Sequence, residues 1–191
     1  VVVTRDAAGV LHALLNVCRH RGSVVAQGSG NRATLQCPYH AWTYELDGRL
    51  RAAPRADEID VDDVALHALA AATWGPFVFV NPDPEPAPLE ELLGPVPQLV
   101  RDGGVEIERL RFRRRGEFEL ACNWKIAVEN YLECYHCAVA HPGFSAVVDV
   151  SPDAYRLETF VLGSSQFAPT KNGDGPVEGQ FHWLWPVTKL Y

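Results

Sequence analysis

Methionine is absent from the 191-residue sequence, even at position 1, and the sequence opens and closes on strand-like runs. We therefore expect a fragment of a longer polypeptide. No apolar run approaches the ~18 residues that a membrane helix needs, and no signal peptide is recognisable at the start. Basic residues are scarce, since 17 Lys and Arg face 24 Asp and Glu, which gives a net charge of −7. Because nucleic-acid binding needs a basic face, we expect neither nucleic acid nor membrane among the partners.

A secreted disulfide framework is also disfavoured. The five cysteines are an odd number, and no secretion signal precedes them. We expect a reducing, cytoplasmic setting, in which cysteine beside histidine more often indicates a metal site. Hydrophobic residues make up 47% of the chain and charged residues 21%, which is ordinary for a globular protein and excludes extensive disorder.

The first 80 residues are predicted to form short strands and turns. Asp47-Gly48 lies between the strand-like runs 42–46 and 50–52, and it is a strong hairpin signal because glycine tolerates positive φ in such turns. The acidic, then alanine-rich stretch 57–72 fits one short helical turn. A largely apolar run over 74–80 predicts the strand that closes this part of the chain.

Prolines at alternate positions mark the middle of the chain. The four prolines between residues 82 and 88 exclude a helix there and favour an extended spacer. We place the domain boundary in or soon after this stretch, which divides the chain into residues 1–100 and 101–191.

The second part is predicted to combine strands with one clear helix. Residues 109–121 alternate enough to be strands, and their three consecutive arginines suit a solvated strand edge, with a phosphate or acidic-partner site as the alternative. Asn123 suits the N-cap of a helix that runs to about Tyr135 with apolar faces. A further strand over 181–185 ends at Pro186.

Two short pairs of metal-binding residue types stand 16 residues apart in the first part: Cys18-Arg19-His20 and Cys37-Pro38-Tyr39-His40. Two Cys and two His fit either tetrahedral zinc or a Rieske-type [2Fe–2S] cluster. Structural zinc usually keeps like ligands together, Cys with Cys and His with His. Here each pair holds one of each type, which suits two metal atoms that each take one ligand from both loops.

At these residues the sequence resembles the Rieske domain of ring-hydroxylating-type Rieske non-haem iron oxygenases, in their catalytic (alpha) subunit. The residues that carry the resemblance are Cys18 to Gly22, Cys37 to Tyr44 and Leu46-Asp47-Gly48. The resemblance implies that Cys18 and Cys37 bind one iron and that His20 and His40 bind the other. Histidine ligation raises the reduction potential, so that an ordinary ferredoxin or flavin reductase can supply electrons.

A second candidate site lies where the predicted helix ends, at Glu133, His136 and His141. On a straight α-helix, His136 and His141 would lie about 140° apart and could not point at one metal. A π-bulge or a helix end between them brings them together, and Pro142 pushes His141 out of α geometry. A helix-end histidine and a turn histidine without a metal is the alternative. Cys134-x-x-Cys137, around His136, fits small apolar packing better than a redox dithiol or a zinc half-site.

The same family has its mononuclear-iron segment at a matching pattern: Asn123-Trp124-Lys125, Glu129-Asn130, and Glu133-x-x-His136-x₄-His141-Pro142. The resemblance implies that His136 and His141 belong to a 2-His-1-carboxylate facial triad. It implies that Glu133 bridges toward the Rieske cluster, and Glu at this position is similar to a subset that includes carnitine and related oxygenases. The third ligand lies well over a hundred residues further on in relatives, whereas this chain ends 50 residues after His141.

The resemblance therefore implies an α+β chain. A Rieske-type all-β [2Fe-2S] domain (1–100) is followed by the first, truncated part of a helix-on-antiparallel-sheet catalytic domain (101–191). We expect a terminal oxygenase with a [2Fe-2S] cluster and mononuclear Fe(II), which uses O₂ and electrons from NAD(P)H through a separate reductase. Its substrate would be an aromatic ring, as in aromatic hydrocarbon catabolism, or an alkyl-amine or quaternary-ammonium compound.

In relatives, head-to-tail homotrimers place the cluster of one chain beside the iron of the next. Two other functions stay open: a Rieske ferredoxin-like electron carrier without its own catalytic iron, and a zinc-stabilised binding protein. The electron carrier gives His136 and His141 no role, and a colourless, zinc-loaded preparation would favour the zinc protein.

Overall fold

The computed structural model describes residues 1–58, 60–83, 85–171, 178–186 and 188–190. The chain divides into two compact units, Val1–Pro86 and Ala87–Tyr191. This division falls inside the proline-rich stretch. We expected the first domain to extend to residue 100, whereas α1 (Leu89–Leu93) and the start of α2 (Val96–Asp102) belong to the second unit. Among the described residues, no helix is long and apolar enough to cross a membrane.

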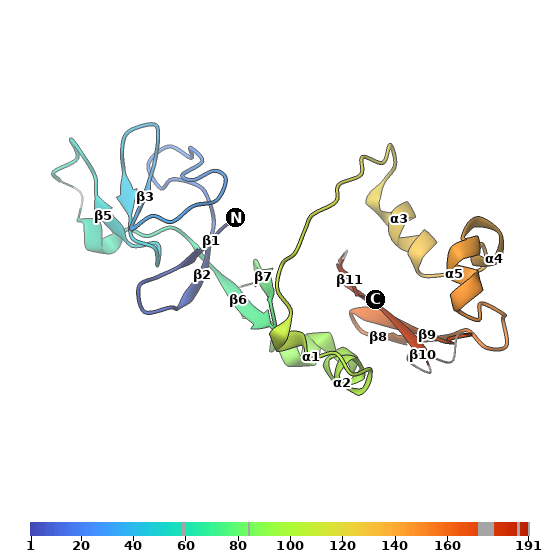
Figure 1. Ribbon diagram of the computed structural model, residues 1–191. Helices are drawn as coiled ribbons and strands as arrows, with labels where there is room; N and C mark the ends of the chain where they lie inside the picture. Colours follow the sequence, from blue (N-terminus) through green and yellow to red (C-terminus); the bar gives the residue numbers. More distant parts are fainter. Residues whose placement is uncertain (59, 84, 172–177, 187, 191) are drawn as a thin grey trace. The chain divides into compact units, whose positions relative to one another are not determined.

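The first unit contains two antiparallel sheets (Figure 1). In the four-stranded sheet the order is β1-β2-β6-β7, and in the three-stranded sheet it is β3-β4-β5. The strands are β1 (Val2–Arg5), β2 (Leu11–Leu14), β3 (Leu35–Gln36), β4 (Thr43–Tyr44), β5 (Leu50–Ala52), β6 (Ala68–Trp74) and β7 (Phe77–Asn81).

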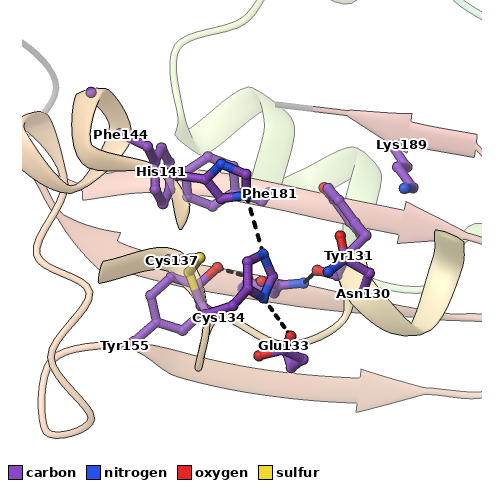
Figure 2. Close-up of a pocket in the computed structure, with 13 residues that line it drawn as sticks. Asn130, Tyr131, Glu133, Cys134, Cys137, His141, Phe144, Tyr155, Phe181 and Lys189 are labelled. Carbon is purple, nitrogen blue, oxygen red and sulfur yellow. Dashed lines mark hydrogen bonds and ion pairs between the residues drawn. A yellow bond between two sulfur atoms is a disulfide. The ribbon is translucent and has the colours of Figure 1, made fainter. Parts of the chain in front are cut away.

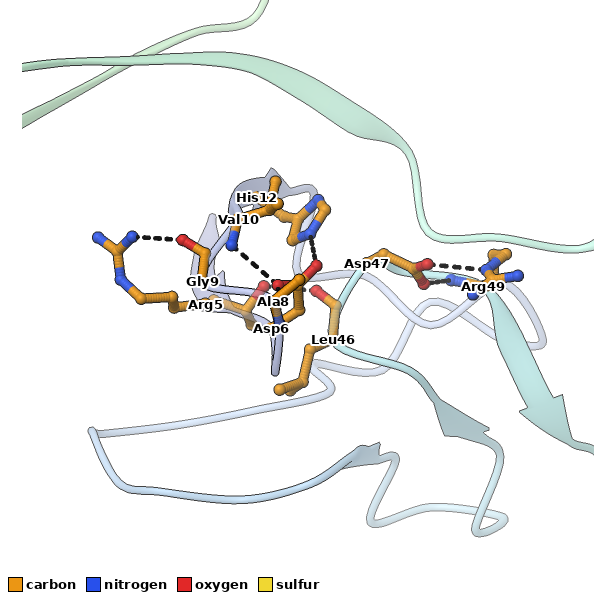
Figure 3. A network of polar contacts seen from close by, with 10 residues as sticks. Arg5, Asp6, Ala8, Gly9, Val10, His12, Leu46, Asp47 and Arg49 are labelled. Carbon is orange, nitrogen blue, oxygen red and sulfur yellow. Dashed lines mark hydrogen bonds and ion pairs between the residues drawn. The ribbon is translucent and has the colours of Figure 1, made fainter.

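Two turns set the geometry of these sheets. Between β1 and β2, the Asp6 carboxylate accepts hydrogen bonds from the backbone N–H groups of Ala8 and Val10 and contacts His12 at 2.9 Å (Figure 3). The hydrogen bond from His12 is the largest cause of the lowered pKa of Asp6. Between β4 and β5, Gly48 has a φ of 94°, which confirms the hairpin predicted at Asp47-Gly48.

The stretch before the proline-rich segment differs from the prediction. The expected helical turn exists as a 3₁₀ turn, η1 (Val61–Asp63), but the alanine-rich residues form strand β6. The apolar run over 74–80 is not one strand, because Gly75 turns the chain and β7 returns antiparallel to β6. A backbone position with positive φ suits glycine, so the reversal occurs there.

The second unit is an antiparallel sheet with helices on it, as the fold class predicted. The helices are α1 (Leu89–Leu93), α2 (Val96–Asp102), α3 (Trp124–Tyr131), α4 (Cys137–Ala140) and α5 (Pro142–Val147), with a 3₁₀ turn η2 (Ile107–Arg109). The sheet order is β11-β10-β9-β8. Its strands are β8 (Arg156–Phe160), β9 (Gly163–Pro169), β10 (Glu178–Leu184) and β11 (Thr188–Leu190).

Helices cover both faces of this sheet. Strand residues alternate between faces, and on one face Gln166 bonds to the Tyr131 carbonyl of α3 while Phe181 contacts Phe144 of α5. On the other face, the C-terminal ends of α1 and α2 lie against the sheet. A Cβ added at Gly94, after α1, would contact Phe160, and one added at Gly103, after α2, would contact Gln180. Coverage on both sides explains why β9 is buried from Gly163 to Ala168 despite its polar residues.

Two predictions for this unit are corrected. Residues 110–120 form neither strand nor helix and are exposed, so the alternation predicted as strands has no pairing partner among the described residues. The helix predicted for 123–135 stops at Tyr131. Its start is confirmed, because the Asn123 side chain accepts a hydrogen bond from the Lys125 N–H.

Candidate functional site

The two Cys/His loops of the first unit share one backbone geometry. Cys18 N–H donates to the Ser23 carbonyl at 2.8 Å, and Gly22 N–H returns to the Cys18 carbonyl. In the second loop, Cys37 N–H donates to Trp42 and Ala41 N–H returns to Cys37. Gly22 and Ala41 occupy the same place in each loop, and both have positive φ, 73° and 59°. Each loop is thus closed by two backbone hydrogen bonds to its cysteine.

This geometry brings the four candidate ligands together as like pairs. The His20 and His40 rings are 4.5 Å apart between centroids. Cys18 and Cys37 are both buried in the core cluster of the unit, and Cys18 is one of the groups that lower the pKa of Cys37. The ring of Trp42 stacks on that of His20 at 5.0 Å, so it shields one side of the histidine pair. Within the described ranges, no group of three or more His, Cys, Asp or Glu converges on one point.

The electrostatics of these loops favour the metal-binding forms of the ligands. Burial raises the pKa of the Cys37 thiol, but hydrogen bonds from the Tyr39 N–H, Cys18, the His40 N–H and Ser23 outweigh it and leave the pKa lowered. Burial, with the nearby charges of His20 and Arg21, lowers the pKa of His40 and favours its neutral imidazole. A thiolate and a neutral imidazole are the forms that bind iron.

A buried tyrosine, Tyr44, completes this site, and the sequence analysis assigned it no role of its own. The Tyr44 hydroxyl lies 3.2 Å from Cys18 Sγ and accepts the Arg19 N–H at 3.0 Å. Burial is the largest cause of its raised pKa, which keeps the hydroxyl protonated. The period-2 alternation from Trp42 along strand β4 was the available signal that Tyr44 points inward.

In the second unit, Glu133, His136 and His141 come together at helix ends. His136 is the N-cap of α4, and His141 ends α4 and starts α5. The two Nε2 atoms face each other at 3.1 Å, while His136 Nδ1 contacts Glu133 Oε1 at 2.5 Å (Figure 2). The hydrogen bond with His136 is the largest cause of the lowered pKa of Glu133. The helix end at His141 lets both histidines point at one place, which a continuous α-helix would not allow.

The separation of the two nitrogens suits one metal ion. Two imidazole nitrogens that bind a metal at about 2.1 Å and roughly at right angles lie about 3.0 Å apart. The observed 3.1 Å between His136 and His141 agrees with this value. The contact with Glu133 takes up the other nitrogen of His136 and leaves Nε2 for the metal.

A cavity of about 580 Å³ opens beside this histidine pair. The side chains around it come from α3, α4, α5 and three strands of the sheet, and several are aromatic. They are Asn130, Tyr131, Glu133, Cys134, His136, Cys137, His141, Gly143, Phe144, Tyr155, Gln166, Phe181 and Lys189.

The cysteines beside His136 differ from the prediction. Cys134 and Cys137 are joined in a disulfide rather than packed as small apolar groups, and both line the cavity. The turn between α3 and α4 brings their Cα atoms to 5.0 Å, within the range that a disulfide spans. Among the described residues, Cys18, Cys37 and Cys122 are free.

Residues 1–68 match the Rieske [2Fe-2S] domain family, and residues 107–188 match the ring hydroxylating alpha subunit (catalytic domain) family. The chain belongs to the Rieske non-haem iron oxygenases. It is 35% identical to the carnitine monooxygenase oxygenase subunit of Escherichia coli strain K12, over 100% of this chain and 54% of that protein. It is 39% identical to the chloroplastic choline monooxygenase of Beta vulgaris, over 82% of this chain and 36% of that protein.

Solved structures agree with this family. The quaternary ammonium Rieske monooxygenase CntA in complex with L-carnitine has a TM-score of 0.80 and 35% identity, over 98% of this chain and 52% of that one. Naphthalene 1,2-dioxygenase from Rhodococcus sp. shares the fold, with a TM-score of 0.70 and 24% identity over 90% of this chain and 42% of that one. The chain thus spans about half the length of the carnitine relatives it matches.

Membership of this oxygenase family implies a Rieske cluster and a mononuclear iron. The donors present fit both groups: paired cysteines and paired histidines for the cluster, and His136 with His141 for the single iron. The sequence analysis did not identify four other pocket residues: Tyr155, which precedes β8, and Gln166, Phe181 and Lys189 of the sheet. These residues belong to no recognisable motif.

Proposed function

We propose that this chain belongs to the terminal oxygenase of a Rieske non-haem iron system that hydroxylates quaternary ammonium compounds. The observation that carries the proposal is the 3.1 Å approach of the His136 and His141 Nε2 atoms at the wall of an aromatic-rich cavity. Relatives that are carnitine and choline monooxygenases support this substrate class over aromatic rings.

In this proposal, Cys18 and Cys37 hold one iron of the cluster, and His20 and His40 hold the other. His136 and His141 hold the mononuclear iron. When bound, that iron supplies O₂ activation, and the overall reaction consumes two electrons and two protons for each C–H bond converted to C–OH, with one water released. After hydroxylation of the carbon beside the ammonium nitrogen, that C–N bond can break: its electron pair goes to the nitrogen, the hydroxyl loses its proton, and an aldehyde and a tertiary amine result.

The protein side chains have distinct tasks around the pocket. Glu133 accepts the Nδ1–H of His136 and fixes the tautomer that leaves Nε2 free. Phe144 and Phe181 pack edge to face at 5.4 Å beside the histidines and present apolar surface to the substrate. Aromatic faces attract quaternary ammonium groups through their negative electrostatic potential.

Electrons reach the protein from NAD(P)H through a ferredoxin or flavin reductase, and a homotrimer brings the cluster of one copy to the iron of the next. The half-buried His40, the exposed His20 and the carboxylate of Glu133 suit the two sides of that contact. A CntA structure described as giving insight into inter-subunit electron transfer supports this arrangement. An electron carrier without catalytic iron is the second function considered, but it leaves the histidine pair and its cavity without a role.

The test is Glu133→Gln in the purified protein with its cluster, mononuclear iron and reductase. We expect the visible spectrum of the cluster to stay unchanged and substrate-dependent O₂ uptake with carnitine-type compounds to fall about 10- to 100-fold. Glu108→Gln, at an exposed glutamate of the same unit, is the matched control. Full activity of Glu133→Gln would remove the proposed role of Glu133. Absence of substrate-dependent O₂ uptake in the wild type, with any quaternary amine, would remove the proposed function.

A further inference from the structure

Lys189 of strand β11 is the lysine among the residues that line the cavity. Its ammonium lies 4.3 Å from the centre of the Tyr131 ring and donates a hydrogen bond to the Ala127 carbonyl at 3.2 Å. Within the part of the chain that the structure describes, no carboxylate pairs with it. Burial lowers the pKa of Lys189, which shows that leaving water is costly for this charge. The ammonium is thus held in place by groups that leave its charge uncompensated.

The charges of the cavity are arranged with opposite signs at separate places. Glu133 carries a carboxylate beside His136, and burial together with Glu133 raises the pKa of Tyr155 to about 12, so that the phenol stays neutral. In the view of Figure 2, Lys189 lies on the far side of Tyr131 from His141. A substrate that carries both charges can therefore place its ammonium toward the histidines and its anionic end toward Lys189.

We propose that Lys189 is the residue that selects zwitterionic quaternary ammonium substrates, by binding a carboxylate on the substrate. This inference rests on the proposed function and deepens it. The relatives include enzymes named for carnitine and glycine betaine, which carry a carboxylate, and for choline, which does not. A choline-like cation gains nothing from Lys189 and is repelled by it, whereas a carboxylate forms a charge-assisted hydrogen bond with it.

The orientation follows from the same contacts. With its carboxylate at Lys189, a betaine directs its trimethylammonium group away from that lysine, toward Phe144, Phe181 and the histidine pair. The carbon beside the nitrogen then faces the proposed iron site. Lys189 is thus a positioning and specificity residue, and it takes no part in the bond changes.

The experiment compares glycine betaine with choline, which differ only by a carboxylate in place of a CH₂OH group. We expect the wild-type protein to bind glycine betaine and L-carnitine more tightly than choline in calorimetric titration, which does not depend on turnover. Lys189→Met should raise Kd and KM for the two carboxylated compounds about 10- to 100-fold and leave the values for choline unchanged or lower. Lys189→Arg should keep the preference, because it keeps the charge.

Lys171→Met is the matched control, since Lys171 bonds to the Ser145 carbonyl at the surface and lies outside the cavity. An equal loss of affinity for all three compounds in Lys189→Met would overturn the inference and make Lys189 a support for Tyr131 and α3. Equal wild-type affinity for glycine betaine and choline would overturn it as well, even if no variant folds. If the wild type binds and oxidises no quaternary amine, the proposed function has failed, which is a different result.

Discussion

Replacing Tyr44 by Phe removes one hydroxyl from a completely buried side chain next to the proposed cluster ligand Cys18. A thiolate bound to iron can only accept, so in the loaded protein the Tyr44 O–H donates to the Cys18 sulfur. A hydrogen bond to sulfur stabilises the reduced, more negative cluster more than the oxidised one. Its loss should therefore lower the reduction potential.

The magnitude follows from the energy of the lost hydrogen bond. A hydrogen bond to a charged acceptor is worth about 1.5–3 kcal/mol. We take roughly half of the mean value to depend on the charge of the cluster. The hydrogen bond is then about 1 kcal/mol stronger in the reduced state than in the oxidised state. Since about 1.4 kcal/mol corresponds to about 59 mV for one electron, Tyr44→Phe should lower the potential by about 40 mV.

The assay is a redox titration followed by electron paramagnetic resonance of the reduced cluster. Tyr39→Phe is the control, because Tyr39 lies in the same ligand loop and is 60% exposed. It should leave the potential within about 10 mV of the wild type, a small fraction of the shift expected from a lost bond. An unchanged or raised potential in Tyr44→Phe, with the cluster spectrum intact, would refute the reasoning.

Three further predictions concern the proposed mononuclear iron site and the stability of the fold. His141→Ala should remove about one iron per chain in metal analysis and leave the visible cluster spectrum intact, and loss of the cluster as well would contradict two independent sites. Gly48→Ala should destabilise the first unit by about 2–4 kcal/mol, measured by denaturant titration. The φ of Gly48 is 94°, and the new Cβ would lie 2.8 Å from Leu14 Cδ2. An unfolding midpoint equal to that of the wild type would contradict this. Burial lowers the pKa of His182, so the folded state binds fewer protons than the unfolded state below about pH 6.5, and stability should fall as the pH decreases from there. His182→Gln should flatten that acid dependence in thermal melts, and an identical slope would show that His182 does not cause it.

Some features were predictable because their causes lie within a few residues. The hairpin at Gly48 needs only a residue that adopts positive φ, and the start of α3 needs only a capping side chain at Asn123. If both histidines bind one metal, the spacing of His136 and His141 predicts a helix end or a π-bulge between them, and α4 ends at Ala140, just before His141. Each of these inferences depends on local geometry, so no distant part of the chain could overrule it.

Other local signals were overruled by distant contacts or their absence. The alanine-rich residues of β6 have good helix propensity, yet they pair with β2 and β7, since sheet pairing outweighs a weak local preference. The alternation over 110–120 predicts a strand, but a strand exists only where a partner supplies hydrogen bonds. Short-range patterns carry no information about such partners.

The sequence by itself determined which donor atoms we propose as metal ligands, because metal chemistry depends on residue type and close spacing. Only the tertiary structure decided what surrounds them. It placed Tyr44 against Cys18, joined Cys134 to Cys137, and brought Lys189 of the sheet to the ring of Tyr131 on a helix. Tyr44 and Cys18, and Lys189 and Tyr131, are distant in sequence, whereas the disulfide between Cys134 and Cys137 depends on the path of the turn between α3 and α4. They meet because the antiparallel sheet and its covering helices must pack together to exclude water.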